Sequence, residues 1–215
     1  MPGAGRRDCV VLIHGLFLSG WALALLAWRM RRRGFDTRLF SYPSVRADFS
    51  RNRARLETFL HSVNAPKVHV LAHSLGGMLA LAVLASEPEL RRGRLVLLGT
   101  PGQGSCVADH LGQRRIGAWL LGECMPHANA LAPYAAPKDV EVGVIAGIKA
   151  VGLGRLVTRL PAPNDGTVTL SETQVAGAAA QTRVNLTHTG LILAPSVADL
   201  AATFFRTGAF GRDPA

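Results

Sequence analysis

The chain has 215 residues, is 48% hydrophobic and has a formal net charge of +10. This length and hydrophobic content predict a single domain over residues 1–215 with one sizeable core, and no apolar stretch is long enough to span a bilayer. The positive charge attracts anions in general, but no helix-turn-helix, zinc-finger spacing or aromatic-basic strand motif accompanies it, which argues against a nucleic-acid-binding protein.

Predicted strands and helices alternate along the chain. The strands are expected at 10–13, 37–41, 68–71, 95–98, 140–145 and 184–186, and the helices at 21–33, 49–63, 75–86 and 196–206. The strands are short apolar runs, whereas residues 56, 59, 60 and 63 repeat at the spacing of a buried helix face. This alternation predicts an α/β protein with a mostly parallel sheet and helices on both faces.

The N-terminal segment Met1–Asp8 contains two arginines and leads into a short apolar run. The run is interpreted as a strand rather than as part of a signal peptide. Three cysteines, Cys9, Cys106 and Cys124, in a chain without a signal peptide indicate reduced thiols and a cytoplasmic protein. Pairing of Cys106 with Cys124 is the alternative for an exported protein.

The first predicted strand ends at His14-Gly15. Loops at the carboxyl ends of parallel strands meet at the functional edge of a sheet. A His-Gly turn at this edge can present a backbone N–H to a developing oxyanion, and the N–H of Leu16 is the expected donor. We expect His14 to brace the loop by hydrogen bonding and not to transfer protons.

The third predicted strand leads into residues 72–76, AHSLG, and then into a helix. A strand, a tight turn and a helix hold Ser74 clear of the backbone, as in the nucleophile elbow G-x-S-x-G, with Ala72 in place of the first glycine. The N–H of Leu75 is the second expected oxyanion donor. We expect His73 to point away from the base that serves Ser74. The alternative is a turn of small residues with an incidental serine.

Residues 102–138 interrupt the alternation, with several glycines and prolines and a possible helix over 107–121. This segment is either a small cap that binds substrate or an ordinary crossover helix with a long loop. Phe17 and Trp119 are the expected substrate-binding residues. Further apolar candidates for the lining are Val107, Leu111, Ile116, Leu120 and Leu121, each of which could equally pack on the core.

The acid and the base are expected after the serine, in the order Ser, Asp or Glu, His. His188 follows a strand-like stretch and precedes Gly190, which places it on a loop at the sheet edge. Asp165 lies in the turn Pro163-Asn164-Asp165-Gly166, where a carboxylate could orient His188 and stabilise the imidazolium. The competing carboxylates are Asp139, Glu141 and Glu172, and a plain Asp-Gly turn is the alternative for Asp165.

The ordered set of motifs resembles the α/β-hydrolase family, and most of all its small bacterial lipases and esterases. The resemblance rests on residues 14–15, the Ser74 elbow, residues 98–101 with 104–105, residues 165–168 and residues 188–191. It covers most of the chain and implies a minimal version of that fold with a small cap insertion.

The resemblance and the residues together predict a serine hydrolase that cleaves carboxylic esters with an apolar acyl chain. Its catalytic residues are expected to be Ser74, Asp165 and His188, and no metal or organic cofactor is expected. The alternatives are a thioesterase or an acyltransferase with the same triad, and a non-catalytic binding module. The expected partner is a small acyl ester or lipid. The arginines at 29–33 and 46–55 are interpreted as solvated helix faces, with contact with an anionic membrane surface as a secondary role for either group.

Overall fold

The structure is a computed structural model that describes residues 6–152 and 154–211, so the first five residues of Met1–Asp8 lie outside the described part. Within these ranges, six strands form one sheet in the order β2-β1-β3-β4-β5-β6, and every neighbouring pair is parallel. The strands are β1 (Cys9–Ile13), β2 (Asp36–Phe40), β3 (Val68–His73), β4 (Leu95–Leu98), β5 (Val142–Gly147) and β6 (Ala180–Val184). The predicted α/β fold with a parallel sheet is confirmed.

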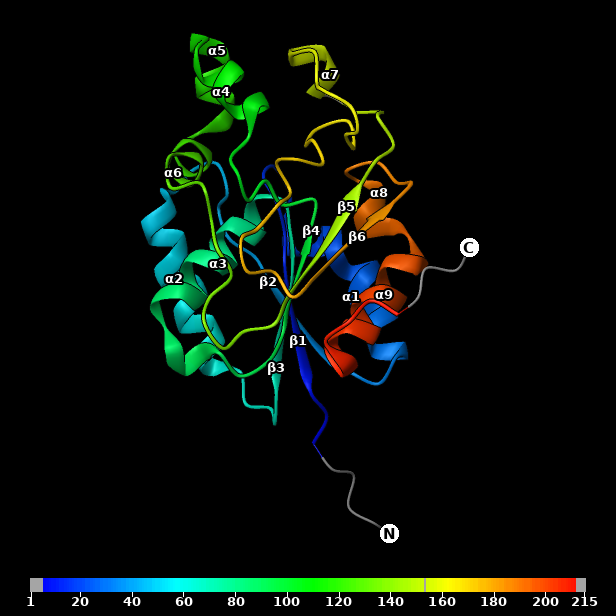
Figure 1. Cartoon of the computed structure of the whole chain (residues 1–215). Helices are drawn as coiled ribbons and strands as arrows, with labels where there is room; N and C mark the ends of the chain where they lie inside the picture. Colours follow the sequence, from blue (N-terminus) through cyan, green and yellow to red (C-terminus); the bar gives the residue numbers. More distant parts are fainter. Residues whose placement is uncertain (1–5, 153, 212–215) are drawn as a thin grey trace.

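Helices cover both faces of the sheet and also stand over its upper edge (Figure 1). Helices α2, α3 and α6 lie on one face and α1, α8 and α9 on the other, while α4, α5 and α7 lie above the sheet. The helices are η1 (Gly20–Leu23), α1 (Ala24–Arg32), α2 (Phe49–Ser62), α3 (Leu75–Ser86), η2 (Pro88–Leu90), α4 (Cys106–Gly112), α5 (Arg115–Leu121), α6 (Cys124–Ala130), α7 (Gly154–Val157), α8 (Gly190–Leu193) and α9 (Pro195–Thr207).

Two hydrophobic layers, one on each face of the sheet, form the core. Because successive side chains of a strand point to opposite faces, Val11 and Ile13 of β1 pack in one layer and Val10 and Leu12 in the other. Helix α3 is buried on nearly all sides. Its contacts with α2, α6 and β3 explain why its sequence is apolar throughout rather than along one stripe.

Several predicted elements differ from the structure: the strand expected at 140–145 is Val142–Gly147, and the helix expected at 21–33 is a 3-10 turn followed by α1. The single helix expected over 107–121 is two helices, and α5 crosses the end of α4 so closely that a Cβ on Gly117 would lie 2.2 Å from the carbonyl oxygen of Leu111. The last strand is Ala180–Val184 rather than 184–186. Its polar residues at 181 and 183 are tolerated because β6 is an edge strand with alternately exposed side chains.

The arginines near the end of α1 are partly engaged by the protein. Arg33 forms an ion pair with Asp199 at 2.7 Å, and Arg29 donates a hydrogen bond to the carbonyl of Leu193. These contacts tie α1 to α8 and α9, so part of this positive charge has a structural role. Among the described residues, no helix is both long and apolar enough to cross a membrane.

Candidate active site

A pocket of about 390 Å³ opens among the loops that follow the strands at their carboxyl ends. Ser74 and His188 both line this pocket, together with Leu16 and Phe17 from the loop after β1. The other lining residues are Leu18, His73, Pro101, Ser105, Val107, Ala108, Leu111, Leu121, Met125, Val151, Gly152, Gly154, Val157, Thr167, Val168 and Thr189. The pocket is thus mainly apolar, with a few polar groups at one place, as is usual for small-molecule sites.

The turn between β3 and α3 holds Ser74 in an unusual backbone conformation. Ser74 has φ 54° and ψ −127°, a region that residues with a Cβ rarely adopt. Its N–H donates to the carbonyl of Leu98 at 2.9 Å, and its carbonyl accepts from Gly77 at 2.8 Å. A Cβ on Gly76 would lie 2.4 Å from the carbonyl oxygen of His14, and one on Gly77 would lie 1.9 Å from Oγ1 of Thr100. The close packing of α3 on its neighbours therefore requires both glycines.

A buried carboxylate holds the ring of His188. Nδ1 of His188 lies 2.7 Å from Oδ2 of Asp165, and the backbone N–H of His188 donates to the carbonyl of Asp165 at 2.9 Å. The other oxygen, Oδ1, accepts from the N–H groups of Thr167 at 2.9 Å and Val168 at 2.7 Å. Asp165 is fully buried. The two backbone donors and the imidazole therefore fix the carboxylate, which leaves Nε2 of His188 for a reacting group.

The competing carboxylates are placed elsewhere. Asp139 is an exposed residue in a turn, and Glu141 forms an ion pair with Arg94. Glu172 accepts hydrogen bonds from the backbone N–H and the hydroxyl of Thr169 and from the N–H of Cys106. Among these four carboxylates, Asp165 is the one that contacts His188, while Glu172 joins the start of α4 to the loop before β6.

Two backbone N–H groups flank Ser74. A Cβ on Gly15 would lie 2.9 Å from Cβ of Ser74, so the loop after β1 approaches the serine closely. Among the hydrogen bonds of the described residues, none is donated by the N–H of Leu16 or of Leu75. Both N–H groups are therefore available to an oxygen atom of a bound molecule.

Three contacts fix His14, as the sequence predicts. Its Nδ1 donates to the carbonyl of Gly15 at 2.8 Å, its Nε2 accepts from the N–H of Tyr42 at 3.1 Å, and the rings of His14 and Tyr42 stack at 4.4 Å. Burial lowers the pKa of His14, which keeps it neutral. The predicted bracing of the loop by hydrogen bonds of His14 is confirmed, and its absence from proton transfer stays a prediction.

The expectation that His73 points away from the predicted base, His188, is wrong. Its ring centroid lies 4.6 Å from that of His188, and its Nε2 donates to the carbonyl of His188 at 3.1 Å. Burial, and after it the charge of His188, hold the pKa of His73 well below its usual value. The neutral ring of His73 thus supports the backbone of the loop that carries His188.

The burial of His69 predicts that the folded protein loses stability in acid. His69 accepts a hydrogen bond from the N–H of Arg94 at 3.0 Å and stacks on Phe205 at 4.7 Å. Burial lowers its pKa to about 4, against an opposing contribution from Asp8, while Arg94 and Lys67 lower it further. Because the pKa is about 6.5 in the unfolded chain, protonation favours unfolding, so stability is full above pH 6.5 and falls as pH drops toward 4.

Urea denaturation between pH 7 and pH 4 measures this loss. His69→Gln, which retains a hydrogen-bond acceptor and does not titrate, is expected to be less stable at pH 7 but to lose less stability on acidification. An unchanged slope of unfolding free energy against pH in His69→Gln would show that His69 does not contribute.

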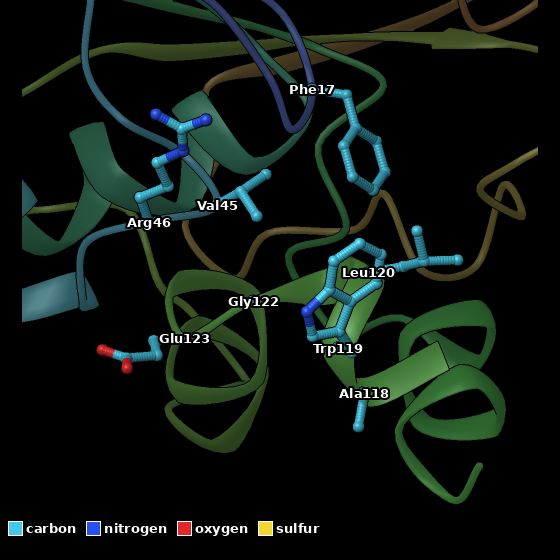
Figure 2. Close-up of a pocket in the computed structure, with 8 residues that line it drawn as sticks. All are labelled: Phe17, Val45, Arg46, Ala118, Trp119, Leu120, Gly122 and Glu123. Carbon is cyan, nitrogen blue, oxygen red and sulfur yellow. The ribbon is translucent and has the colours of Figure 1, made fainter. Parts of the chain in front are cut away.

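The residues expected to bind substrate lie in two different places. Phe17 lines the Ser74 pocket, whereas Trp119 does not and instead lines a second hollow, which Phe17 also lines (Figure 2). Of the further apolar candidates, Val107, Leu111 and Leu121 line the Ser74 pocket, and Ile116 and Leu120 do not.

Part of the pocket wall has no clear signal in the sequence. Val151, Gly152, Gly154 and Val157 belong to the connection between β5 and β6, which reaches over the sheet from the side opposite α4 and α5 (Figure 1). Short apolar residues between glycines and prolines are typical of any loop, so their pattern does not indicate a binding wall.

All three cysteines are free thiols. Cys124 is buried and accepts a hydrogen bond from Nδ2 of Asn52 at 3.4 Å, while Cys106 is exposed at the start of α4. Burial, and after it the carboxylate of Glu172, raise the pKa of Cys106 to about 11. The alternative pairing of Cys106 with Cys124 is not formed.

Comparisons with known proteins find one matching family model and several solved structures with a similar fold. A family model described as "Alpha/beta hydrolase family" matches residues 10–214. The mature lipase BlEst2 of Bacillus licheniformis is similar with a TM-score of 0.70 at 20% identity, covering 97% of this chain and 94% of the lipase. The metagenomic carboxyl esterase MGS0156 is similar with a TM-score of 0.72 at 18% identity, covering 94% of this chain and 75% of the esterase. The ydeN gene product of Bacillus subtilis is similar with a TM-score of 0.64 at 18% identity, covering 93% of this chain and 100% of that protein. A search of curated proteins finds no match.

Proposed function

The chain belongs to the alpha/beta hydrolase family, and from this we propose that it is a serine hydrolase that cleaves carboxylic esters with an apolar acyl chain. The observation that carries the proposal is the 2.7 Å contact between Nδ1 of His188 and Oδ2 of Asp165, at a pocket that Ser74 also lines. A buried carboxylate, an imidazole and a hydroxyl on a strained turn are the parts that an activated serine nucleophile needs.

The proposed reaction has two halves. Oγ of Ser74 attacks the ester carbonyl while Nε2 of His188 takes its proton, and the N–H groups of Leu16 and Leu75 stabilise the negative charge on the carbonyl oxygen. Asp165 stabilises the imidazolium, which then gives its proton to the departing alcohol. Water attacks the acyl-enzyme with His188 as base, which releases the carboxylic acid and restores Ser74.

The lining of the pocket supports an apolar acyl group. Val107, Leu111, Leu121 and Met125 come from the α4–α6 segment, and Val157 comes from α7. No lysine or arginine is among the lining residues that the structure describes, so nothing there would pair with a charged acyl chain. We propose that residues 102–138 act as the cap over this pocket, and that the free thiols reflect a cytoplasmic location.

Two other functions remain as alternatives: thioester cleavage or acyl transfer by the same three residues, and a binding module without catalysis. The purified protein is to be incubated with p-nitrophenyl esters of several chain lengths, with an acyl thioester, and with an ester plus a competing alcohol. We expect the protein to hydrolyse the p-nitrophenyl esters, with the free carboxylic acid as the main product. A dominant new ester would indicate acyl transfer, and absence of any turnover would contradict the enzyme assignment.

A further inference from the structure

We propose that the hollow beside Phe17 extends the acyl site, so that the enzyme takes esters of long, unbranched fatty acids. This inference rests on the proposed ester hydrolysis and names its substrate class. The expected occupant of the hollow is the distal half of the acyl chain, held against Phe17 and Trp119.

Two cavities share one side chain. The Ser74 pocket has a volume of about 390 Å³ and the second hollow one of about 610 Å³, and Phe17 lines both. Figure 2 shows the ring of Phe17 next to the indole of Trp119 and the side chain of Leu120. The two rings are 61% and 78% exposed, so each presents a large apolar surface to solvent without a protein partner covering it.

The chemistry of the site sets the direction in which the acyl chain of the substrate leaves the reacting carbon. At the reacting carbon, the carbonyl oxygen faces the N–H groups of Leu16 and Leu75, and the leaving oxygen must lie within reach of His188. The alcohol therefore occupies the side of His188. The acyl chain takes the remaining direction, toward the wall that α4 and α5 provide, and Phe17, in the loop after β1, lines both this pocket and the second hollow.

Backbone contacts hold the second hollow open before any ligand binds. The N–H of Glu123 donates to the carbonyl of Val45 at 3.3 Å, and a Cβ on Gly122 would lie 2.1 Å from the same carbonyl oxygen. Gly122 has φ 63°, a conformation that glycine adopts without strain. The loop after β2 is thus locked against the α5–α6 junction, which spares a bound chain the cost of ordering the site.

The charged residues of the hollow lie away from the two rings. Arg46 and Glu123 line the hollow on the side of Val45, and Figure 2 shows them apart from Phe17 and Trp119. Val45 lies between Arg46 and the ring of Phe17, and Leu120 and Ala118 add apolar lining near Trp119 (Figure 2). A chain of methylene groups can therefore contact apolar surface over the part of the hollow nearest to Phe17.

Values of kcat/KM for p-nitrophenyl acetate, butyrate, dodecanoate and hexadecanoate test the inference in the wild type and in Trp119→Ala. We expect Trp119→Ala to lower kcat/KM for the two long esters about tenfold, the effect of two lost methylene contacts, and to change the two short esters less than about twofold. Trp119→Phe keeps a flat apolar ring and is expected to lose less. The matched control is Trp28→Ala, since Trp28 is half-exposed on α1 and lines neither cavity.

An equal loss for all four esters in Trp119→Ala, or no loss for any of them, would overturn the inference while leaving ester hydrolysis intact. The same holds if Trp28→Ala reproduces the selective loss, because a general effect of surface tryptophans on long-chain substrates would then explain the result. If the wild type hydrolyses none of the esters, the proposed function itself fails, and the inference fails with it.

Discussion

Replacing Ser74 with alanine is expected to abolish ester hydrolysis while the fold persists. The hydroxyl is the proposed nucleophile, and removing it should lower kcat by a factor on the order of 10⁶. The Ser74 side chain makes no capping hydrogen bond at the start of α3, and alanine suits the turn as well as serine does. The free energy of unfolding should therefore change by less than about 0.5 kcal/mol.

Ser105→Ala is the matched control for this experiment. Ser105 lines the same pocket, but its hydroxyl accepts from the N–H of Ala108 at 3.2 Å and caps α4. This variant should keep its turnover and lose about 1 kcal/mol of stability with the cap. Kinetics and urea denaturation of both variants separate the two roles, and a folded Ser74→Ala protein with normal turnover would remove the serine mechanism.

The second large effect is expected from Asp165→Asn, which should lower kcat by about 10⁴. The amide oxygen can still accept from Thr167 and Val168, which turns the amide NH₂ toward Nδ1 of His188. His188 must then accept at Nδ1 and carry its proton on Nε2, the tautomer that cannot take a proton from Ser74. KM should change little, because Asp165 is buried behind the imidazole and is absent from the pocket lining.

Glu172→Gln provides the comparison for Asp165→Asn. Glu172 is hydrogen-bonded to Thr169 and to the N–H of Cys106, so its change should reduce stability with little effect on kcat. A fall in kcat for Glu172→Gln as large as that for Asp165→Asn would show that the acid has been assigned to the wrong residue.

The sequence predicts the parts of the fold that depend on local pattern. The bounds of α3 and β4 agree with the predicted ranges, since the apolar run of α3 begins after the turn at Ser74 and ends before Glu87-Pro88, and that of β4 lies between Gly93 and Gly99. The sequence does not predict the bounds of the edge strand β6, because its alternating polar residues leave no continuous apolar run. A central strand is buried on both faces and gives a stronger signal than an edge strand.

The candidate site is harder to predict because its residues meet through long loops. The pairing of Asp165 with His188 brings together residues 23 positions apart, and only chain order and turn type suggested it. The orientation of His73 follows from the alternation along β3, which places it on the same face as Leu71, where the loop that carries His188 packs; the sequence does not tell which elements cover that face. The position of Trp119 outside the Ser74 pocket goes with the break between α4 and α5, which a periodic apolar pattern over 107–121 does not predict.

Labelling with a fluorophosphonate probe tests the serine mechanism most directly. The probe reacts with a serine hydroxyl that a neighbouring base activates, and mass spectrometry of a peptide digest locates the adduct. We expect one adduct per chain, on Ser74, with labelling lost in Ser74→Ala and much slower in Asp165→Asn. An unlabelled wild-type protein, or an adduct on another serine that persists in Ser74→Ala, would contradict the serine mechanism.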